Sequence, residues 1–198
     1  MEIDIKNIKA AYRTATESER TLLYTLFPDL HLGEDDTQAD NRPVTERIKT
    51  FEDACRELGK DHPMVLAYQN TNLHDPEVAE ENRDILVYMK LRIITAALNE
   101  GWQPQFTEDE WRWYPWFCLW TEDELSEKSD EWRQQHALCG FDDYQGEWAG
   151  FAFAASNGAP SHTTAYIGSR LCYQSEALAD YSGRQFADLW ADFLLIRK

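Results

Sequence analysis

The chain has 198 residues, a length that suits one domain with a sizeable core. Its 36 acidic and 19 basic residues give a formal net charge of −17 at neutral pH, which makes direct binding to the phosphates of DNA or RNA unfavourable. The charge leaves open the binding of a basic protein, and the imitation of a nucleic acid towards an enzyme that acts on one.

The N-terminal part predicts two helices separated by an acidic loop. Residues 16–19 (Thr-Glu-Ser-Glu) match a capping box ahead of an apolar stretch, and Pro28 ends the helix that this box starts. Residues 31–43 are polar, acidic and without periodicity, so we expect an exposed loop there. Apolar residues then recur at helical spacing over 44–58, and Gly59 is placed to cap that helix at its C-terminus.

The longest predicted helix spans residues 76–100. It follows a short piece around 63–69 and begins with Asp75 and Pro76, in the order expected of an N-cap and a first helical residue. Two apolar stripes in its second half cover most of its circumference, and Gly101 closes it. This pattern predicts a long central helix that is largely buried.

A tryptophan-rich run follows, with five of the eight tryptophans between residues 102 and 120. Residues 107–110 (Thr-Glu-Asp-Glu) match a capping box and predict one or two helical turns. We expect Pro115 to stop these turns, because the residue before a proline avoids the α region. Residues 116–120 then predict a strand.

The remaining sequence predicts a polar helix, a small sheet and a final helix. A further capping box at 121–124 starts a helix that runs to about Leu138. Residues 148–155 and 166–173 have the aromatic and β-branched character of strands, with a loop at 156–161 between them. Residues 175–195 return to helical spacing. We therefore predict a single α+β domain over 1–198, with several helices around the long central helix and a small, mainly antiparallel sheet from the second half.

The aromatic run is the candidate binding site. Large exposed apolar patches are rare on monomeric proteins, so most of these rings are expected in the core. The alternation around Arg112 and the break at Pro115 nevertheless predict that some of them point outward, where they would stack on a ligand or anchor a partner. The candidate ligand- or partner-binding residues are Trp111, Trp113, Tyr114, Trp116 and Trp120.

No motif of known chemistry accompanies these rings. The five histidines form no His-x-x-x-His pair, and the four cysteines form no Cys-x-x-Cys pair, so we predict no metal site and four reduced thiols. The acidic pairs near residues 108 and 122 are explained by helix capping. The glycines form neither a dinucleotide-binding nor a phosphate-binding loop, and no Gly-x-Ser-x-Gly elbow occurs. We therefore predict no cofactor and no catalytic residue, and a non-enzymatic role.

Five segments resemble a family of uncharacterised proteins from prophages and mobile elements of gut anaerobic bacteria. They are RIKTFEDAC (47–55), LRIITAALNEGW (91–102), WYPWF (113–117), IGSRLC (167–172) and QFADLW (185–190). The resemblance implies a phage-associated protein, either part of the particle or its assembly or an accessory that acts on the host. It supplies no activity, cofactor or catalytic residue.

Three functions follow as hypotheses. The first is a phage-associated structural or protein-interaction module, which requires a protein partner or self-assembly. The second is an acidic mimic of nucleic acid that inhibits a host enzyme. The third is a carbohydrate-binding module or hydrolase built around the tryptophan-rich segment. The N-terminus has no apolar core of signal-peptide length, and no later segment is apolar enough for a membrane span, so we expect a cytoplasmic or virion-associated protein with no membrane contact.

Overall fold

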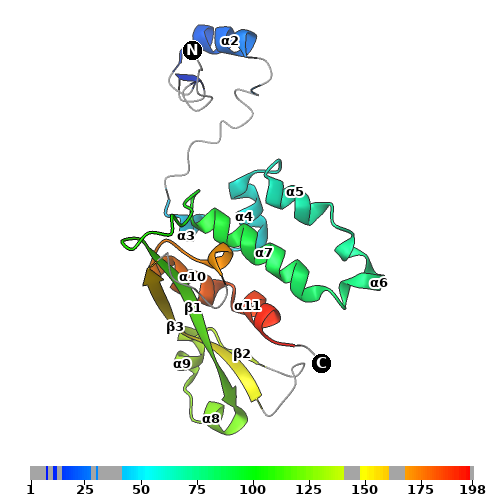
Figure 1. The fold of residues 1–198 in the computed structure, drawn as a ribbon, viewed down its shortest axis with the longest axis vertical. Coiled ribbons are helices and arrows are strands. Elements are labelled where there is room, and N and C mark those ends of the chain that lie inside the picture. Colours follow the sequence, from blue (N-terminus) through cyan, green and yellow to red (C-terminus); the bar gives the residue numbers. More distant parts are fainter. Residues whose placement is uncertain are drawn as a thin grey trace. The chain divides into compact units, whose positions relative to one another are not determined.

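The computed structural model describes residues 42–140, 148–160 and 168–196, together with Ile8, 11–12, 15–27 and Leu30 (Figure 1). The chain divides into two compact units, Met1–Arg42 and Pro43–Lys198. In the first unit, α2 (Glu17–Leu26) confirms the helix predicted after residue 16, with its capping box formed. The predicted acidic loop at 31–43 lies outside the described residues, except for Arg42 and Pro43.

The second unit is an α+β fold, as predicted. Its first half is helical, and its second half adds three strands and further helices. The first-half elements are α3 (Val44–Arg47), α4 (Phe51–Leu58), α5 (Pro63–Gln69), the 3₁₀ helix η2 (Asn72–His74), α6 (Pro76–Ala79) and α7 (Arg83–Leu98). The second-half elements are β1 (Trp111–Thr121), α8 (Glu122–Ser126), α9 (Asp130–Gln135), β2 (Cys139–Gly140), β3 (Trp148–Pro160), the 3₁₀ helix η3 (Ser169–Leu171), α10 (Glu176–Gln185) and α11 (Ala187–Leu194).

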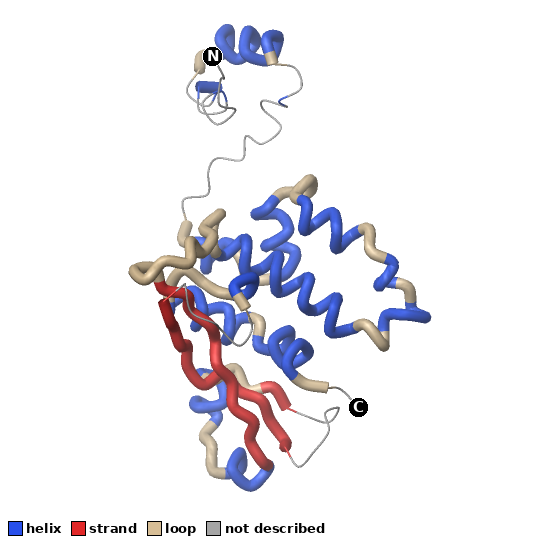
Figure 2. Tube along the Cα trace, in the orientation of Figure 1, coloured by secondary structure: helices blue, strands red, loops and turns tan. Residues whose placement is uncertain are grey.

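The strands form an antiparallel sheet in the order β1-β3-β2 (Figure 2). β1 and β3 pair along their length, with Trp113 opposite Gly158, and a bulge follows Trp116. Helix α10 packs on β1 and β3, and α11 packs on both the sheet and α7. Helices α4 and α5 also pack against α7. The sheet, the two C-terminal helices and α7 therefore build one core.

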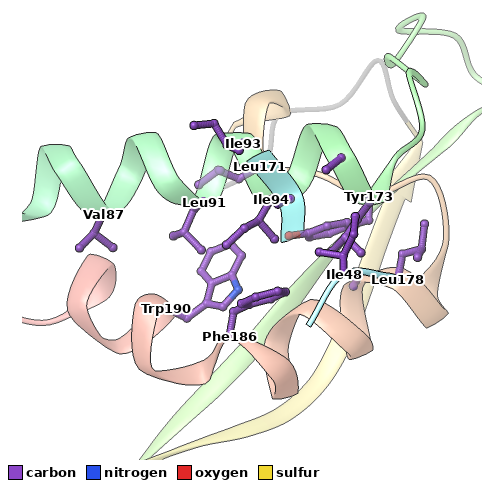
Figure 3. Close-up of a cluster of buried hydrophobic side chains, with 14 of the residues drawn as sticks. Ile48, Val87, Leu91, Ile93, Ile94, Leu171, Tyr173, Leu178, Phe186 and Trp190 are labelled. Carbon is purple, nitrogen blue, oxygen red and sulfur yellow. The ribbon is translucent and has the colours of Figure 1, made fainter. Parts of the chain in front are cut away.

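That core is aromatic and aliphatic, and a buried polar network crosses it. Val87, Leu91 and Ile94 of α7 point towards Trp190 and Phe186 (Figure 3). The Ser182 hydroxyl accepts from Trp190 Nε1 at 3.2 Å and lies 2.5 Å from the Tyr173 hydroxyl. The Tyr173 hydroxyl in turn lies 3.0 Å from Thr95 Oγ1 of α7. These bonds satisfy the buried polar groups of Thr95, Tyr173, Ser182 and Trp190 and link α7, α10 and α11.

Four predicted helices are interrupted. The predicted 44–58 helix breaks at Ile48, whose side chain is fully buried, and restarts at Thr50, which forms a capping box with Asp53. The predicted helix from 76 to 100 is two helices, α6 and α7, so the long central helix is not confirmed. The segment predicted to run to Leu138 divides into α8 and α9, and the last helix divides at Phe186. The chain changes direction at each break between two helices, so that short helices can pack around a small core.

The tryptophan-rich run differs most from its prediction. Residues 107–110 form no helix, and β1 continues through Pro115. Trp113 exchanges both backbone hydrogen bonds with Tyr173 on the outer edge of β1, at 3.0 and 2.9 Å. Since hydrogen-bonding direction alternates along a strand, the nitrogen of Pro115 also faces that outer edge and removes no bond to β3. An edge position therefore explains the proline.

The strand predicted at 166–173 is also wrong within its described part. From Gly168 the chain enters η3, and only Tyr173 makes a bridge, to Trp113. Conversely, β3 extends to Pro160 through the loop predicted at 156–161, of which residue 161 lies outside the described residues. The side chain of Trp113 explains the extension, because its indole lies against Gly158, where a Cβ would come within 2.8 Å of the ring.

Candidate functional site

The five candidate aromatic residues lie on β1 but do not form one surface. Side chains alternate between the two faces of a strand. Trp111 and Trp113 share the face that meets α10, with their ring centroids 6.0 Å apart. Tyr114, Trp116 and Trp120 belong to the opposite face by alternation. The strand therefore brings Trp111 and Trp113 together and separates them from the other three.

Exposure divides the same five residues again. Trp111 and Trp116 are 47% and 43% exposed, whereas Tyr114 is buried, and burial raises the pKa of its hydroxyl to about 12. Trp120 packs edge-on against Trp132 of α9 at 5.1 Å. Two rings are thus accessible, one on each face of the strand. A continuous stacking platform of five rings is absent from this part of the described structure.

A pocket lies at the C-terminal end of α7, and sequence reasoning missed it. One side is a stripe of α7 at helical spacing, made of Arg92, Thr95, Ala96 and Asn99. The other sides come from the start of α5, the loop that follows α7, and η3. The pocket encloses about 630 Å³, and its remaining lining residues are Leu58, His62, Met64, Gly101, Trp102, Gln103, Pro104, Phe106, Ser169, Arg170 and Cys172. We call it the arginine pocket.

The charge of the arginine pocket opposes that of the chain. Its described lining residues include Arg92 and Arg170 and no aspartate or glutamate, although acidic residues outnumber basic ones 36 to 19 in the sequence. A third arginine, Arg112 of β1, lies directly behind the wall. Its Nη1 donates to the hydroxyl of Ser169, and its guanidinium carbon is 5.7 Å from the Phe106 ring centroid. Both of these partners line the pocket.

Arg112 is an unusually placed cation. Its residue is only 2% exposed, and its Nε and Nη2 have no hydrogen-bond partner among the described residues. The Nε of Arg92 is likewise buried without a described partner. A buried charged donor that lacks an acceptor costs about 1–3 kcal/mol or more. The pocket is therefore lined by two arginines, Arg92 and Arg170, and backed by the buried charge of Arg112.

The loop between α7 and β1 is held in place by Glu110. Its two carboxylate oxygens accept from Trp102 Nε1 at 3.2 Å and from the backbone N–H of Gln105 at 2.7 Å. Its own N–H donates to Thr107 Oγ1 at 3.2 Å. Residues 107–110 thus use their capping-type bonds to close a loop instead of starting a helix. This loop carries Phe106, whose backbone has φ = 58°.

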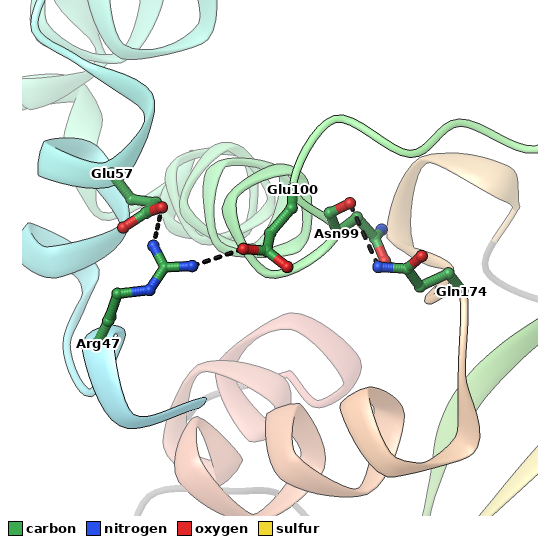
Figure 4. Close-up of polar contacts among 5 residues, drawn as sticks. All are labelled: Arg47, Glu57, Asn99, Glu100 and Gln174. Carbon is green, nitrogen blue, oxygen red and sulfur yellow. Dashed lines mark hydrogen bonds and ion pairs between the residues drawn. The ribbon is translucent and has the colours of Figure 1, made fainter. Parts of the chain in front are cut away.

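Asn99 fixes the opposite wall, and its backbone carbonyl accepts from Gln174 Nε2 at 3.4 Å (Figure 4). Its Nδ2 donates to the carbonyl of Cys172 at 2.8 Å, and its Oδ1 accepts from the N–H of Gln174 at 3.1 Å. Next to it, Glu100 accepts from Arg47 Nη2 at 2.5 Å, and the Nη1 of the same arginine donates to Glu57. The end of α7 is thereby tied to η3 on one side and to α3 and α4 on the other.

The thiols near these elements are poor nucleophiles. Burial raises the pKa of Cys172 to about 11, and the nearby Arg112 only partly offsets this. Burial, together with a hydrogen bond of 3.1 Å to Asp188, raises the pKa of Cys139 to about 12. Both are therefore protonated at neutral pH. Within the described residues, no group of three or more His, Cys, Asp or Glu is placed to hold a metal ion.

Sequence reasoning had one usable signal for this site. Arg112 is the single basic residue of the aromatic run, in a strand where its neighbours are apolar. An arginine between two tryptophans in a strand is either exposed to solvent or buried next to a group that compensates its charge. Its companions Arg92 and Arg170 lie 20 and 58 positions away, so no local pattern joins the three.

No protein-family model matches the chain, and no curated protein or solved structure matches it either. In the part of the chain that the structure describes, no helix is long and apolar enough to cross a membrane. A function for this chain therefore rests on the geometry of the arginine pocket and of β1.

Proposed function

We propose that the chain is a non-enzymatic binding protein whose arginine pocket takes a small anion. The observation that supports this proposal is the burial of Arg112. The residue is only 2% exposed, and two nitrogens of its guanidinium group have no hydrogen-bond partner among the described residues. Proteins retain a buried charge where something compensates it. An anion held in the pocket by Arg92 and Arg170 compensates the charge of Arg112 electrostatically from the other side of the wall. Charge-assisted hydrogen bonds to the two lining arginines are about twice as strong as neutral ones.

The surroundings support an anion and not a cation. Arg92 and Arg170 line the pocket, and its described lining residues carry no carboxylate. Glu110, on the same loop as Phe106, already accepts hydrogen bonds at both oxygens. The volume of about 630 Å³ lies within the range of small-molecule sites.

Calorimetric titration with inorganic phosphate tests this function. Arg170 lines the pocket and is exposed, so Arg170→Gln should leave the fold intact and weaken phosphate binding about 10-fold. Arg56→Gln is the matched control, because that arginine has a side chain 75% exposed, lies outside the pocket and makes a surface pair with Asp53. Equal affinities for the wild type and Arg170→Gln, or no phosphate binding at all, would contradict the proposal.

A second candidate is the protein-interaction role expected from the sequence. The exposure of Trp111 and Trp116 supports it, because tryptophan contributes disproportionately to interface energies. Sedimentation velocity at rising concentration tests self-association, with Trp116→Ser expected to abolish it. A sedimentation coefficient independent of concentration would remove self-assembly as the role of Trp116.

Phage association remains a proposal supported by the five resembling segments alone. The acidic-mimic hypothesis stays a prediction. We do not propose the carbohydrate platform further, because its five rings divide between the two faces of β1.

A further inference from the structure

We propose that the anion bound in the arginine pocket carries a planar aromatic ring, which stacks on Phe106. This inference rests on the proposed function, since it names the class of ligand for the same site. It is carried by the rings that line the pocket, by the distance from one of them to a cation, and by the volume.

The first observation is the exposure and backbone conformation of Phe106. Its side chain is 57% exposed although it is apolar, and its φ of 58° lies in the left-handed region, which bulky residues rarely adopt. Such a conformation is strained and persists only where the surroundings impose it. Here the hydrogen bonds of Gln105 to Glu110 and to Gln103 hold the preceding residue. The loop thus fixes an exposed ring at the pocket wall.

The second observation is that this ring adjoins a cation. The Phe106 centroid lies 5.7 Å from the guanidinium carbon of Arg112. Trp102 lines the same pocket, and its indole N–H is bound to Glu110, so its ring is fixed as well. A ligand that bears a ring and an anionic group would meet these aromatic side chains and the lining arginines Arg92 and Arg170 in one pocket, with the charge of Arg112 behind the wall.

The third observation concerns the other polar groups of the pocket. Thr95 Oγ1 is bonded to Tyr173, and both polar atoms of the Asn99 side chain are bonded to the chain near Cys172. His62 uses Nδ1 to cap α5. The groups that remain for recognition include the two arginines, Gln103 and the apolar surface of Leu58, Met64, Ala96 and Pro104. This combination favours an amphipathic anion over a polar sugar.

The volume points the same way. A bare phosphate would occupy a small part of about 630 Å³, and the lining around the remaining space includes the apolar and aromatic side chains of Leu58, Met64, Trp102 and Phe106 as well as polar ones. Ligand sites bury most of the surface of what they bind. The shared chemistry is therefore a ring bearing a phosphate or a carboxylate, and nucleoside monophosphates and aromatic acids are its two natural sources.

Matched ligand pairs separate the ring from the charge. We would titrate the full chain with phenyl phosphate against methyl phosphate, and with benzoate against acetate, and then with adenosine monophosphate. We expect the ring-bearing member of at least one pair to bind about 10-fold more tightly than its partner. A preference within the phosphate pair, extended by adenosine monophosphate, identifies a nucleotide-like source, whereas a preference within the carboxylate pair alone identifies an aromatic acid.

Two variants at Phe106 test the stacking surface. Phe106→Leu keeps an apolar side chain and removes the ring, so it should reduce the ring preference to below about 3-fold, and Phe106→Tyr should retain it. A preference that survives Phe106→Leu would overturn the assignment of Phe106. Equal binding within both pairs, with Arg170→Gln still weakening all four ligands, would overturn the aromatic inference and leave the anion site standing. Binding of none of these ligands would overturn both.

Discussion

The packing of α10 on the sheet gives the sharpest test of the fold. Gly183 of α10 faces the junction of β1 and β3, where an added Cβ would lie 2.5 Å from the ring of Phe153 and 2.8 Å from Cβ of Pro115. Phe153 is buried, and Arg184 lies over its ring with 4.9 Å from the guanidinium carbon to the centroid. Neither neighbour is the far end of a flexible side chain, so the helix itself must move.

Two effects of Gly183→Ala oppose each other. Alanine is favoured over glycine within a helix by about 1 kcal/mol. Overpacking a core costs about 1–3 kcal/mol, and simultaneous contact with a ring and a proline places this site at the upper end. We therefore expect a net loss of about 2 kcal/mol in the free energy of unfolding.

Urea unfolding followed by tryptophan fluorescence measures the change. The midpoint should fall at an unchanged slope, since the surface exposed on unfolding is the same. Gly140→Ala is the matched control, because a Cβ there meets nothing within 4 Å and its backbone needs no positive φ. A Gly183→Ala protein as stable as the wild type would refute the close contact between α10 and the sheet.

Three further predictions concern buried polar groups and thiols. Ser182→Ala should lower the free energy of unfolding by about 2 kcal/mol, because it leaves Trp190 Nε1 without its acceptor, and an unchanged urea midpoint would contradict the network. Burial raises the pKa of Tyr173 to about 12, so the neutral phenol favours the folded state below pH 10 and that contribution is lost as the pH rises from about 10 to 12. Urea midpoints that stay constant over this interval, or fall equally in Tyr173→Phe, would count against it. At pH 8 the exposed Cys118 should react with Ellman's reagent in a fast phase that Cys118→Ser removes, while Cys172 should react only on unfolding, and a fast phase that survives the substitution would be inconsistent with these positions.

Local signals in the sequence predicted ends of helices better than their lengths. The capping boxes at Thr16 and Thr121 start helices as predicted, and Gly59 closes α4 with φ = 91°. The hydrogen bonds of a capping box join residues three positions apart, so the motif can be recognised from the sequence alone. The capping box at 107–110 failed because Glu110 is engaged by Trp102 and Gln105, contacts that a local pattern does not reveal.

Tertiary contacts decided the elements that were misread. Pro115 was predicted to end an element, yet it lies in a strand because its nitrogen faces the edge of the sheet. The residues at 168–173 have strand-like composition, but their role is to bring Tyr173 to the edge of β1 and its hydroxyl into the core. Such positions depend on contacts with residues more than 50 positions away in the sequence. The spacing of residues within a local segment does not reveal these contacts.

The same limit applies to the candidate site. The aromatic run was visible as composition, and the structure shows that β1 separates its rings between two faces. The arginine pocket depends instead on α7, η3 and β1 meeting, with Asn99 joining the first two. The sequence did not predict it, although Arg112 stands out as the single basic residue among aromatic neighbours.

The arginine pocket also gives the charge of −17 a role in selectivity. Charges are screened over about 8 Å at physiological ionic strength, so a small anion inside the pocket is governed by the arginines within that distance. A polyanion such as DNA extends many times further, and its remaining phosphates would lie over a surface dominated by carboxylates. On the proposal made above, local positive charge within a global negative charge would admit a small anion and exclude a long one. The unfavourable binding of nucleic acid expected from composition and the anion site proposed from geometry are therefore compatible, because the two charge effects act over different distances.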